Sequence, residues 1–288
     1  MPDAPTQSKA VLITGCSSGI GHATAERLAR AGWTVYATAR RVEAIADLEA
    51  AGCRLLALDV TDEASMQAAV DHVEAEHGAI GVLINNAGYS QSGAIESVAI
   101  EDVRRQFETN VFGLVRLTQL VLPKMRAQRW GKIVNLSSMG ANFTFPGGGF
   151  YHATKYAVEA ITDALRFEVK GFGIDVVIIQ PGLIRTGFGD AAVASLDGET
   201  AGDGPYDAFN AQVAQSTTDV YEKGPLAKLG GEPDAVAKAI EQAITTGRPK
   251  IRYRVTPSAH LLIGQRRLMT AGMWDGFLRR QFPQPGKG

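Results

Sequence analysis

Short apolar runs and longer helical segments alternate along most of this chain. The apolar runs, rich in Val, Ile and Leu, occupy residues 10–14, 34–38, 54–58, 82–84, 133–136, 175–179 and 250–255. The segments between them carry apolar residues at helical spacing, up to residue 31 and over 61–77, 101–125, 151–171 and 233–246. Continuous apolar strands joined by helices form a parallel sheet that is covered on both faces and joined by right-handed crossovers. We therefore expect an α/β fold that binds its ligands at the carboxyl ends of the strands, where the strand order reverses.

Length and composition exclude several classes of protein. A chain of 288 residues can bury one substantial core, so we expect a single domain. The formal net charge is −1, which argues against a nucleic acid partner. Cys16 and Cys53 are the only cysteines, and His22 and His152 lack other ligands at metal spacing, so we predict no disulfide and no metal site. Residues 1–9 are polar and no apolar run is long enough to span a bilayer, which predicts a cytoplasmic protein.

A glycine-rich loop follows the first apolar run and precedes the first helix. Its glycines permit a tight turn, and they let backbone amides and the helix N-terminus approach a pyrophosphate. The loop therefore predicts a bound dinucleotide. The residues that we assign to its binding are Gly15, Ser17, Ser18, Gly19, Ile20 and Gly21. An ordinary strand-to-helix turn is the alternative, because the spacing differs from the general Gly-x-Gly-x-x-Gly fingerprint.

The second apolar run ends in Ala39 and Arg40, followed by Arg41. Roughly 20 residues beyond the glycine loop, an NAD-binding unit usually carries an acidic residue that accepts hydrogen bonds from the ribose hydroxyls. Arg40 can instead pair with a 2′-phosphate through charged hydrogen bonds. This pattern predicts NADP(H) in preference to NAD(H), unless the two arginines only cap the end of a surface strand.

The next two strand ends complete the predicted cofactor site. The carboxylate of Asp59 is placed to meet the amino group of adenine, and Val60 follows it. The turn after the fourth run contains Asn86, Ala87 and Gly88, which leave room for a cofactor because two of them are small. We assign all five residues to cofactor binding.

Asn110 interrupts the helix predicted over residues 101–125, and Pro123 marks the fraying end of that helix. An asparagine within an apolar helical stretch is costly unless its amide finds hydrogen-bond partners. We therefore predict a polar role for Asn110, with a surface or packing role as the alternative.

Tyr151 and Lys155 carry the clearest catalytic pattern. If Tyr151 opens the helix over residues 151–171, the two side chains lie at i and i+4 on one face. A free phenol has a pKa of about 10, and a nearby cation lowers that pKa and makes the phenol a usable acid or base at neutral pH. Ser138, at the end of the preceding strand, is placed to hydrogen-bond a substrate oxygen that Tyr151 protonates. Tyr151 and Lys155 can also be an ordinary pair on an amphipathic helix.

Two segments lie outside the alternating pattern. Residues 186–231 are rich in Gly, Ala, Ser and Asp, and form a connection far longer than the usual length of about 5 residues. We interpret them as a mobile lid over the substrate; the alternative is a disordered insertion without catalytic relevance. The tail at 257–288 mixes apolar residues with four arginines. We expect it to pack on the pocket or at a subunit interface; a basic amphipathic segment on a membrane surface is the alternative.

Five motifs occur in one order along the chain: Thr14-Gly15-x-x-x-Gly19-x-Gly21, Asn85-Asn86-Ala87-Gly88, Ser138, Tyr151-x-x-x-Lys155 and Pro181-Gly182. In this combination the chain resembles a classical short-chain dehydrogenase/reductase over nearly its whole length. The loop after residue 15 and the strands at 35–40 and 58–62 are most similar to the hydroxysteroid and retinol dehydrogenase branch.

The resemblance implies a single doubly wound Rossmann-type domain over 1–288, with a seven-stranded parallel sheet and helices on both faces. It implies a catalytic tetrad of Asn110, Ser138, Tyr151 and Lys155, the last two also contacting the cofactor. Pro181, Gly182, Ile184 and Thr186 are implied on the nicotinamide side. A homodimer or homotetramer is expected.

These residues predict reversible hydride transfer between NADP(H) and a secondary alcohol or its carbonyl form, with a hydrophobic small-molecule substrate. Ser138 and Tyr151 bind the reacting oxygen, and Asn110 supports a water for proton exchange. Two alternatives belong to other classes: a catalytically silent NADPH-binding sensor or scaffold, and an epimerase or dehydratase of related fold.

Overall fold

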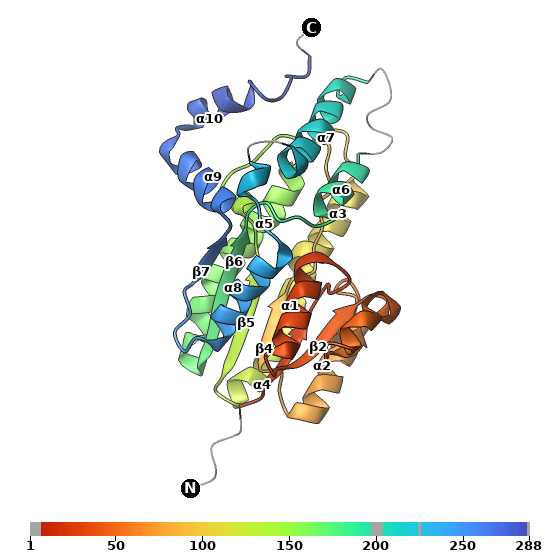
Figure 1. The fold of residues 1–288 in the computed structure, drawn as a ribbon, viewed down its shortest axis with the longest axis vertical. Helices are drawn as coiled ribbons and strands as arrows, with labels where there is room; N and C mark the ends of the chain where they lie inside the picture. The colour runs from red at the N-terminus through yellow and green to blue at the C-terminus, as the bar shows by residue number, and fades with distance from the viewer. Residues whose placement is uncertain (1–6, 197–203, 224–225, 287–288) are drawn as a thin grey trace.

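The computed structural model describes residues 7–196, 204–223 and 226–286. Within these ranges seven parallel strands form one sheet in the order β3-β2-β1-β4-β5-β6-β7 (Figure 1). The strands are β1 (Ala10–Ile13), β2 (Thr34–Ala39), β3 (Arg54–Ala57), β4 (Val82–Asn85), β5 (Gly131–Leu136), β6 (Ile174–Pro181) and β7 (Arg252–Val255). Every predicted strand is therefore present, and the seven-stranded doubly wound α/β fold is confirmed.

Helices cover both faces of the sheet. The described helices are α1 (Gly19–Arg30), α2 (Glu63–His77), α3 (Ile100–Phe107), α4 (Gly113–Ala127), α5 (Gly149–Val169), α6 (Phe188–Ala194), α7 (Asp207–Glu222), α8 (Pro233–Thr245), α9 (Pro257–Leu268) and α10 (Ala271–Leu278). Figure 1 shows α1 and α8 side by side on one face of the sheet. Helices α2, α4 and α5 contribute to the core on the opposite face.

A hydrophobic core lies between the sheet and the helices on each face, because neighbouring residues of a strand point to opposite faces of the sheet. On β1, Val11 and Ile13 pack with Leu28 of α1 in one core. Leu12 packs in the other core with Val70 of α2 and Leu117 of α4. All four residues of β1 are buried. A strand that is apolar on both faces requires a helix on each side, which explains the continuous apolar runs in the sequence.

Some predicted helix boundaries are wrong. Helix α5 begins at Gly149 rather than at Tyr151. Helix α2 begins at Glu63 rather than at residue 61, because the carboxylate of Asp62 caps it and accepts hydrogen bonds from the backbone N–H of Ala64 at 2.9 Å and Ser65 at 3.2 Å. Pro123 lies inside α4, which continues to Ala127. Buried Val121 and Met125 flank the proline, and their packing holds the helix together around it.

The predicted interruption at Asn110 is confirmed as a π-helical turn, η2 (Glu108–Phe112), between α3 and α4. A π-helical turn inserts an extra residue into the helix and re-aims the side chains around it, and such turns are frequent at functional sites. Here the turn places Asn110 in the interior, where it is 2% exposed.

The segment at 186–231 contains two helices, α6 and α7, that the sequence pattern did not indicate. A short 3-10 turn, η5 (Ala227–Leu229), follows them, and residues 197–203 and 224–225 of the predicted lid lie outside the described residues. In the tail, Trp274 of α10 packs against Phe143 and Phe145, with ring centroids 5.7 Å apart in both pairs. The tail therefore packs on the loop between Ser138 and Tyr151. No helix in the described ranges is long and apolar enough to cross a membrane.

Candidate active site

The reversal of strand order lies between β1 and β4, and the loops after these strands are joined by side-chain hydrogen bonds. The hydroxyl of Thr14 accepts hydrogen bonds from the backbone N–H groups of Asn86 and Ala87, both at 3.0 Å. The amide of Asn86 donates to the carbonyl oxygens of Thr14 at 2.9 Å and Gly15 at 3.0 Å. Asn86 therefore anchors the glycine loop to the end of β4.

Three glycines make this close approach possible. Gly15 has a φ of +72°, and a Cβ there would lie 2.9 Å from the Cα of Ala87. A Cβ on Gly21 would lie 2.2 Å from the carbonyl oxygen of Gly15, and one on Gly19 would lie 3.0 Å from Cγ2 of Thr186. The start of α1 is thus packed between the glycine loop and Thr186.

Replacing Asn86 with Ala is expected to lower the free energy of unfolding by about 2 kcal/mol, because two carbonyl oxygens lose their hydrogen bonds. Chemical denaturation measures this difference. Asn142→Ala is the matched control, since the Asn142 amide makes a single long hydrogen bond of 3.4 Å to the carbonyl oxygen of Met139. Equal stability of the two variants would show that the Asn86 hydrogen bonds do not hold the loop.

The ends of β2 and β3 carry the residues predicted to bind the adenosine part of a cofactor. Arg40 and Arg41 are exposed directly after β2, and within the described ranges neither forms an ion pair. One carboxylate oxygen of Asp59 accepts hydrogen bonds from the backbone N–H of Thr61 at 2.9 Å and from its hydroxyl at 2.7 Å. Val60 is buried and packs closely on the start of α4. A Cβ on Gly113 would lie only 2.3 Å from the carbonyl oxygen of Val60.

Ser138, Tyr151 and Lys155 meet where β5 ends and α5 begins. The ammonium of Lys155 lies 5.8 Å from the centroid of the Tyr151 ring and donates a hydrogen bond to the carbonyl oxygen of Leu136 at 2.8 Å. Ser138 is the second residue after the strand, and it lies close enough to the Tyr151 hydroxyl to influence its ionisation. The structure therefore brings these three predicted residues together.

Burial sets the ionisation of this group. It raises the pKa of Tyr151 to about 12, while hydrogen bonding to Ser138 acts in the opposite direction. Burial lowers the pKa of Lys155 to about 8, and the negative charge of Glu159 opposes that shift. The net shift of the Tyr151 pKa is upward, because desolvation outweighs the lowering expected from Lys155, whose ammonium donates its hydrogen bond to Leu136. Tyr151 is a neutral hydrogen-bond donor at neutral pH.

Asn110 lies beside this group through its contacts with the turn after β4. Its carbonyl oxygen accepts from the backbone N–H of Tyr89 at 3.0 Å, and its amide donates to the Tyr89 carbonyl oxygen at 2.9 Å and the Thr154 hydroxyl at 3.1 Å. A Cβ on Gly88 would lie 3.1 Å from the Asn110 oxygen and 3.7 Å from the Lys155 ammonium. Gly88 therefore lies between Asn110 and Lys155.

The family model of the short chain dehydrogenases matches residues 9–196, which include the glycine loop and all four residues of this group. The chain belongs to the short-chain dehydrogenase family. The resemblance found in the sequence is thus confirmed at the level of the family. Because the members of this family are oxidoreductases, the protein is an oxidoreductase. The branch within the family stays a prediction.

Individual relatives match almost the whole short-chain dehydrogenase chain. The 3-ketodihydrosphingosine reductase of Bacteroides thetaiotaomicron is 38% identical over 264 residues, which cover 90% of this chain and 92% of the relative. The NADPH-dependent 3-dehydrocapnine reductase of Ornithobacterium rhinotracheale is 36% identical over 255 residues, covering 85% and 87%. A crystal structure of a short-chain dehydrogenase from Streptomyces avermitilis has a TM-score of 0.75 and 36% identity, and covers 95% of this chain and 98% of its own.

His152 positions the loop between Ser138 and Tyr151 in this short-chain dehydrogenase. Its ring is buried and lies between two backbone groups: Nδ1 is 2.7 Å from the carbonyl oxygen of Gly140, and Nε2 accepts from the N–H of Phe145 at 3.2 Å. Burial lowers the pKa of His152, which favours this neutral form. His152 is therefore a buried residue that positions this loop, a role that no sequence pattern indicated. Among the described residues no cluster of acidic, histidine and cysteine side chains is suited to a metal ion.

The chain after β6 lies beside the start of α1. Leu183 donates its N–H to the hydroxyl of Ser258 at 3.0 Å, and Ile184 forms an isolated parallel bridge with Gly231. The Ile184 side chain is buried in a core, whereas Thr186 is half-buried against Gly19. Pro181 is the last residue of β6. A Cβ on Gly182 would lie 2.4 Å from the hydroxyl oxygen of Ser258, so only glycine fits there. Of the residues expected on the nicotinamide side, Thr186 is thus the one beside the glycine loop.

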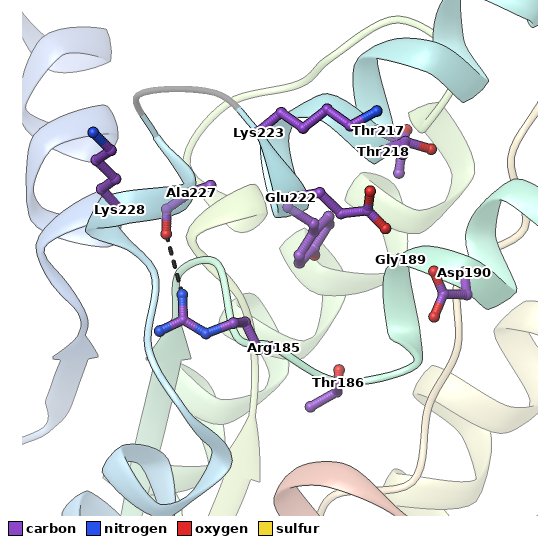
Figure 2. Close-up of a pocket in the computed structure, with 11 residues that line it drawn as sticks. Arg185, Thr186, Gly189, Asp190, Thr217, Thr218, Glu222, Lys223, Ala227 and Lys228 are labelled. Atoms are coloured by element: carbon purple, nitrogen blue, oxygen red, sulfur yellow. Dashed lines mark hydrogen bonds between the residues drawn. The ribbon is translucent and has the colours of Figure 1, made fainter.

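A cavity of about 590 Å³ lies between α6, α7 and the loop that contains Thr186 (Figure 2). Arg185 at its edge is held by Glu232 at 2.5 Å and donates to the carbonyl oxygen of Ala227, as the dashed line in Figure 2 marks. Next to the cavity, the ring of Phe188 lies 5.3 Å from the ring of Tyr151. The cavity therefore adjoins the Tyr151 site of the short-chain dehydrogenase.

Proposed function

We propose that this protein is an NADP(H)-dependent oxidoreductase that interconverts a secondary alcohol and its carbonyl form, with a hydrophobic carbonyl compound as substrate. The observation that carries the proposal is the meeting of Ser138, Tyr151 and Lys155 at the carboxyl edge of the sheet. The Lys155 ammonium lies beside Gly88 and Asn110, at the edge where such sheets bind ligands.

The glycine loop fits a dinucleotide. Ser18 occupies the N-cap position of α1, and within the described ranges its side chain makes no capping hydrogen bond, so the first amides of the helix are open to a phosphate. We assign the pyrophosphate to this loop, adenine to Asp59 and Val60, and the nicotinamide side to Thr186 and its neighbours. When bound, the dinucleotide supplies or accepts the hydride.

The residues of the chain handle the oxygen and its proton. Ser138 and Tyr151 hydrogen-bond the carbonyl oxygen of the substrate, and Tyr151 transfers its proton to that oxygen as negative charge develops there. The positive charge of Lys155 makes the resulting phenolate less costly and holds the nicotinamide ribose. Asn110 positions the Tyr89 segment and Thr154, and we retain it as the residue that supports proton exchange through water.

Arg40 supports the preference for NADP(H), since it is exposed, lacks an ion pair among the described residues, and directly follows β2. The relative from Ornithobacterium rhinotracheale is NADPH-dependent by name. A guanidinium at this position offers paired hydrogen bonds to a 2′-phosphate.

Replacing Arg40 with Asp is expected to raise the Kd for NADPH roughly 10- to 100-fold, because one or two charged hydrogen bonds are replaced by repulsion. The difference in Kd between NADPH and NADH should become smaller. Fluorescence titration of both dinucleotides measures the change. Arg30→Asp, at the opposite end of α1, makes the same charge change away from the predicted phosphate site and controls for net charge. An unchanged preference would remove Arg40 from cofactor choice.

A panel of hydrophobic ketones and aldehydes, followed by NADPH absorbance, tests the proposed activity directly. Oxidation of NADPH with at least one carbonyl compound supports it. Tight NADPH binding without oxidation across the panel would favour the silent sensor, and product formation without net cofactor consumption would favour an epimerase or dehydratase.

We also propose that the protein acts in the cytoplasm as a homodimer or homotetramer. Large apolar side chains on the outer surfaces of α5 and η2 support self-association, since Phe167 is 88% exposed and Phe112 is 53% exposed. Light scattering coupled to gel filtration measures the subunit number. The segments 186–231 and 257–288 are proposed as the substrate lid and as a cover for the pocket or an interface.

A further inference from the structure

Tyr221, in the last turn of α7, lies close to the active site although it is distant in sequence. A Cβ built on Gly189 would lie 3.0 Å from Cδ2 and 3.3 Å from Cε2 of Tyr221, so the ring rests against the backbone of α6. The residue before Gly189 is Phe188, whose ring lies 5.3 Å from that of Tyr151. The start of α6 therefore contacts Tyr151 through Phe188 and Tyr221 through Gly189.

The Tyr221 hydroxyl is available to a ligand. Tyr221 lines the cavity between α6 and α7 together with Thr186 and Gly189. No residue in the described ranges hydrogen-bonds its hydroxyl. Burial raises the pKa of Tyr221, and so does the charge that Tyr151 would carry when ionised, so the two phenols sense each other and Tyr221 stays a neutral hydroxyl. The Tyr221 side chain is half-buried at the cavity, so its hydroxyl is open to a polar group of a ligand there.

The reacting oxygen does not need Tyr221. A carbonyl oxygen has two lone pairs, and in the proposed function Ser138 and Tyr151 occupy both. Tyr221 comes from α7 and lines the cavity that adjoins Phe188. A group bonded to the neighbouring carbon of the substrate is therefore the part that Tyr221 can reach while the carbonyl oxygen stays on Ser138 and Tyr151.

We propose that Tyr221 is a specificity-determining residue, which hydrogen-bonds a hydroxyl or amino substituent on the carbon next to the reacting carbonyl. The preferred substrates are then ketones with such a neighbouring substituent rather than simple alkyl ketones, and the cavity receives the rest of that side of the substrate. This inference rests on the proposed function, because it requires that the carbonyl carbon be reduced at the Tyr151 site.

The test compares 2-octanone with each enantiomer of 3-hydroxy-2-octanone, which adds one hydroxyl on the neighbouring carbon. The ratio of kcat/KM between the hydroxyketone and the plain ketone is measured for the wild type and for Tyr221→Phe, which keeps the ring on Gly189. We expect the ratio for the preferred enantiomer to fall about tenfold in Tyr221→Phe, the effect of one lost hydrogen bond. Because the ratio is independent of the amount of folded enzyme, a purely structural effect does not move it.

Two further variants sharpen this test. Gly189→Ala places a methyl group against the Tyr221 ring, and should lower the ratio in the same direction. Tyr156→Phe removes a phenol hydroxyl from a side chain that is 44% exposed on α5, and should leave the ratio unchanged.

The outcomes separate this inference from the proposed function. If the wild type reduces both ketones and Tyr221→Phe leaves the ratio unchanged, the assignment of Tyr221 is overturned. An equal fall in kcat/KM for both ketones also overturns the assignment, because it would show that the Tyr221 hydroxyl acts on the reacting oxygen. If the wild type oxidises no NADPH with any carbonyl compound, the proposed function itself fails and the inference fails with it.

Discussion

Replacing Tyr151 with Phe is expected to lower kcat for ketone reduction by about 10²- to 10⁴-fold, the usual contribution of a positioned general acid. Phenylalanine keeps the ring beside Phe188 and deletes only the hydroxyl that donates the proton. The pKa of about 12 keeps Tyr151 protonated over the whole working range, so the loss should be similar from pH 6 to pH 8. Steady-state kinetics that follow NADPH absorbance measure it.

NADPH binding should be largely retained in Tyr151→Phe, which a fluorescence titration checks. Tyr156→Phe, five residues further along α5 on an exposed surface, is the matched control and should keep its turnover. Reduction by Tyr151→Phe at the wild-type rate would show that another group supplies the proton, and the proposed role of Tyr151 would be wrong.

Replacing Lys155 with Met is expected to lower kcat by about 10²- to 10³-fold and, in the same variant, to stabilise the fold. The loss of rate follows from removing the charge that favours the phenolate. The gain in stability follows from the cost of burying an ammonium, since the pKa of Lys155 is lowered from 10.5 to about 8. This shift corresponds to about 3 kcal/mol, less about 1 kcal/mol for the lost hydrogen bond to Leu136.

The stabilisation should depend on pH in a defined direction. Between about pH 8 and pH 10.5 the unfolded chain binds a proton on Lys155 and the folded chain does not, so wild-type stability falls as the pH drops through this window. Lys155→Met should therefore exceed the wild type by about 2 kcal/mol below pH 8, and the cost of the buried charge should disappear above pH 10.5. Denaturant unfolding at about pH 7 and about pH 11 measures the two limits. A less stable variant at pH 7 would contradict the burial argument.

The same ionisation should appear in the activity. Reduction requires Lys155 to be charged, so kcat/KM of the wild type should fall above about pH 8. Glu159→Gln removes the negative charge that favours protonated Lys155, and should move this fall to lower pH. If the pH dependence of kcat/KM is the same in Glu159→Gln and in the wild type, the fall above pH 8 belongs to a group other than Lys155.

Much of the fold could be predicted because its signals are local. The strands are continuous apolar runs, and a strand buried on both faces tolerates little else, as β1 illustrates. The glycine loop could be predicted as well, because a side chain at Gly15 or Gly21 would clash with the backbone of a neighbouring segment. Tyr151 and Lys155 are one helical turn apart, so their proximity follows from helix geometry alone.

Other features depend on contacts between distant segments. Helix α7 carries weak apolar periodicity, and packing in a small separate cluster around Phe209 and Val213 stabilises it. Helix α2 begins after Asp62 rather than at residue 61, because both Thr and Asp can cap a helix and the choice depends on the path of the incoming chain. His152 gave no signal because its partners, Gly140 and Phe145, are backbone groups.

The sequence by itself determined the family, the sheet, and the presence of a phenol and an ammonium on one helical turn, because periodicity and short motifs act within a few residues. Only the tertiary structure decided the electrostatics of that pair. Burial of Tyr151 and Lys155 opposes the charged form of each, and desolvation arises from the whole surrounding fold rather than from neighbours in the sequence. The same reason explains why Tyr221 emerged only in three dimensions, since α7 brings it to Gly189 across a long connection.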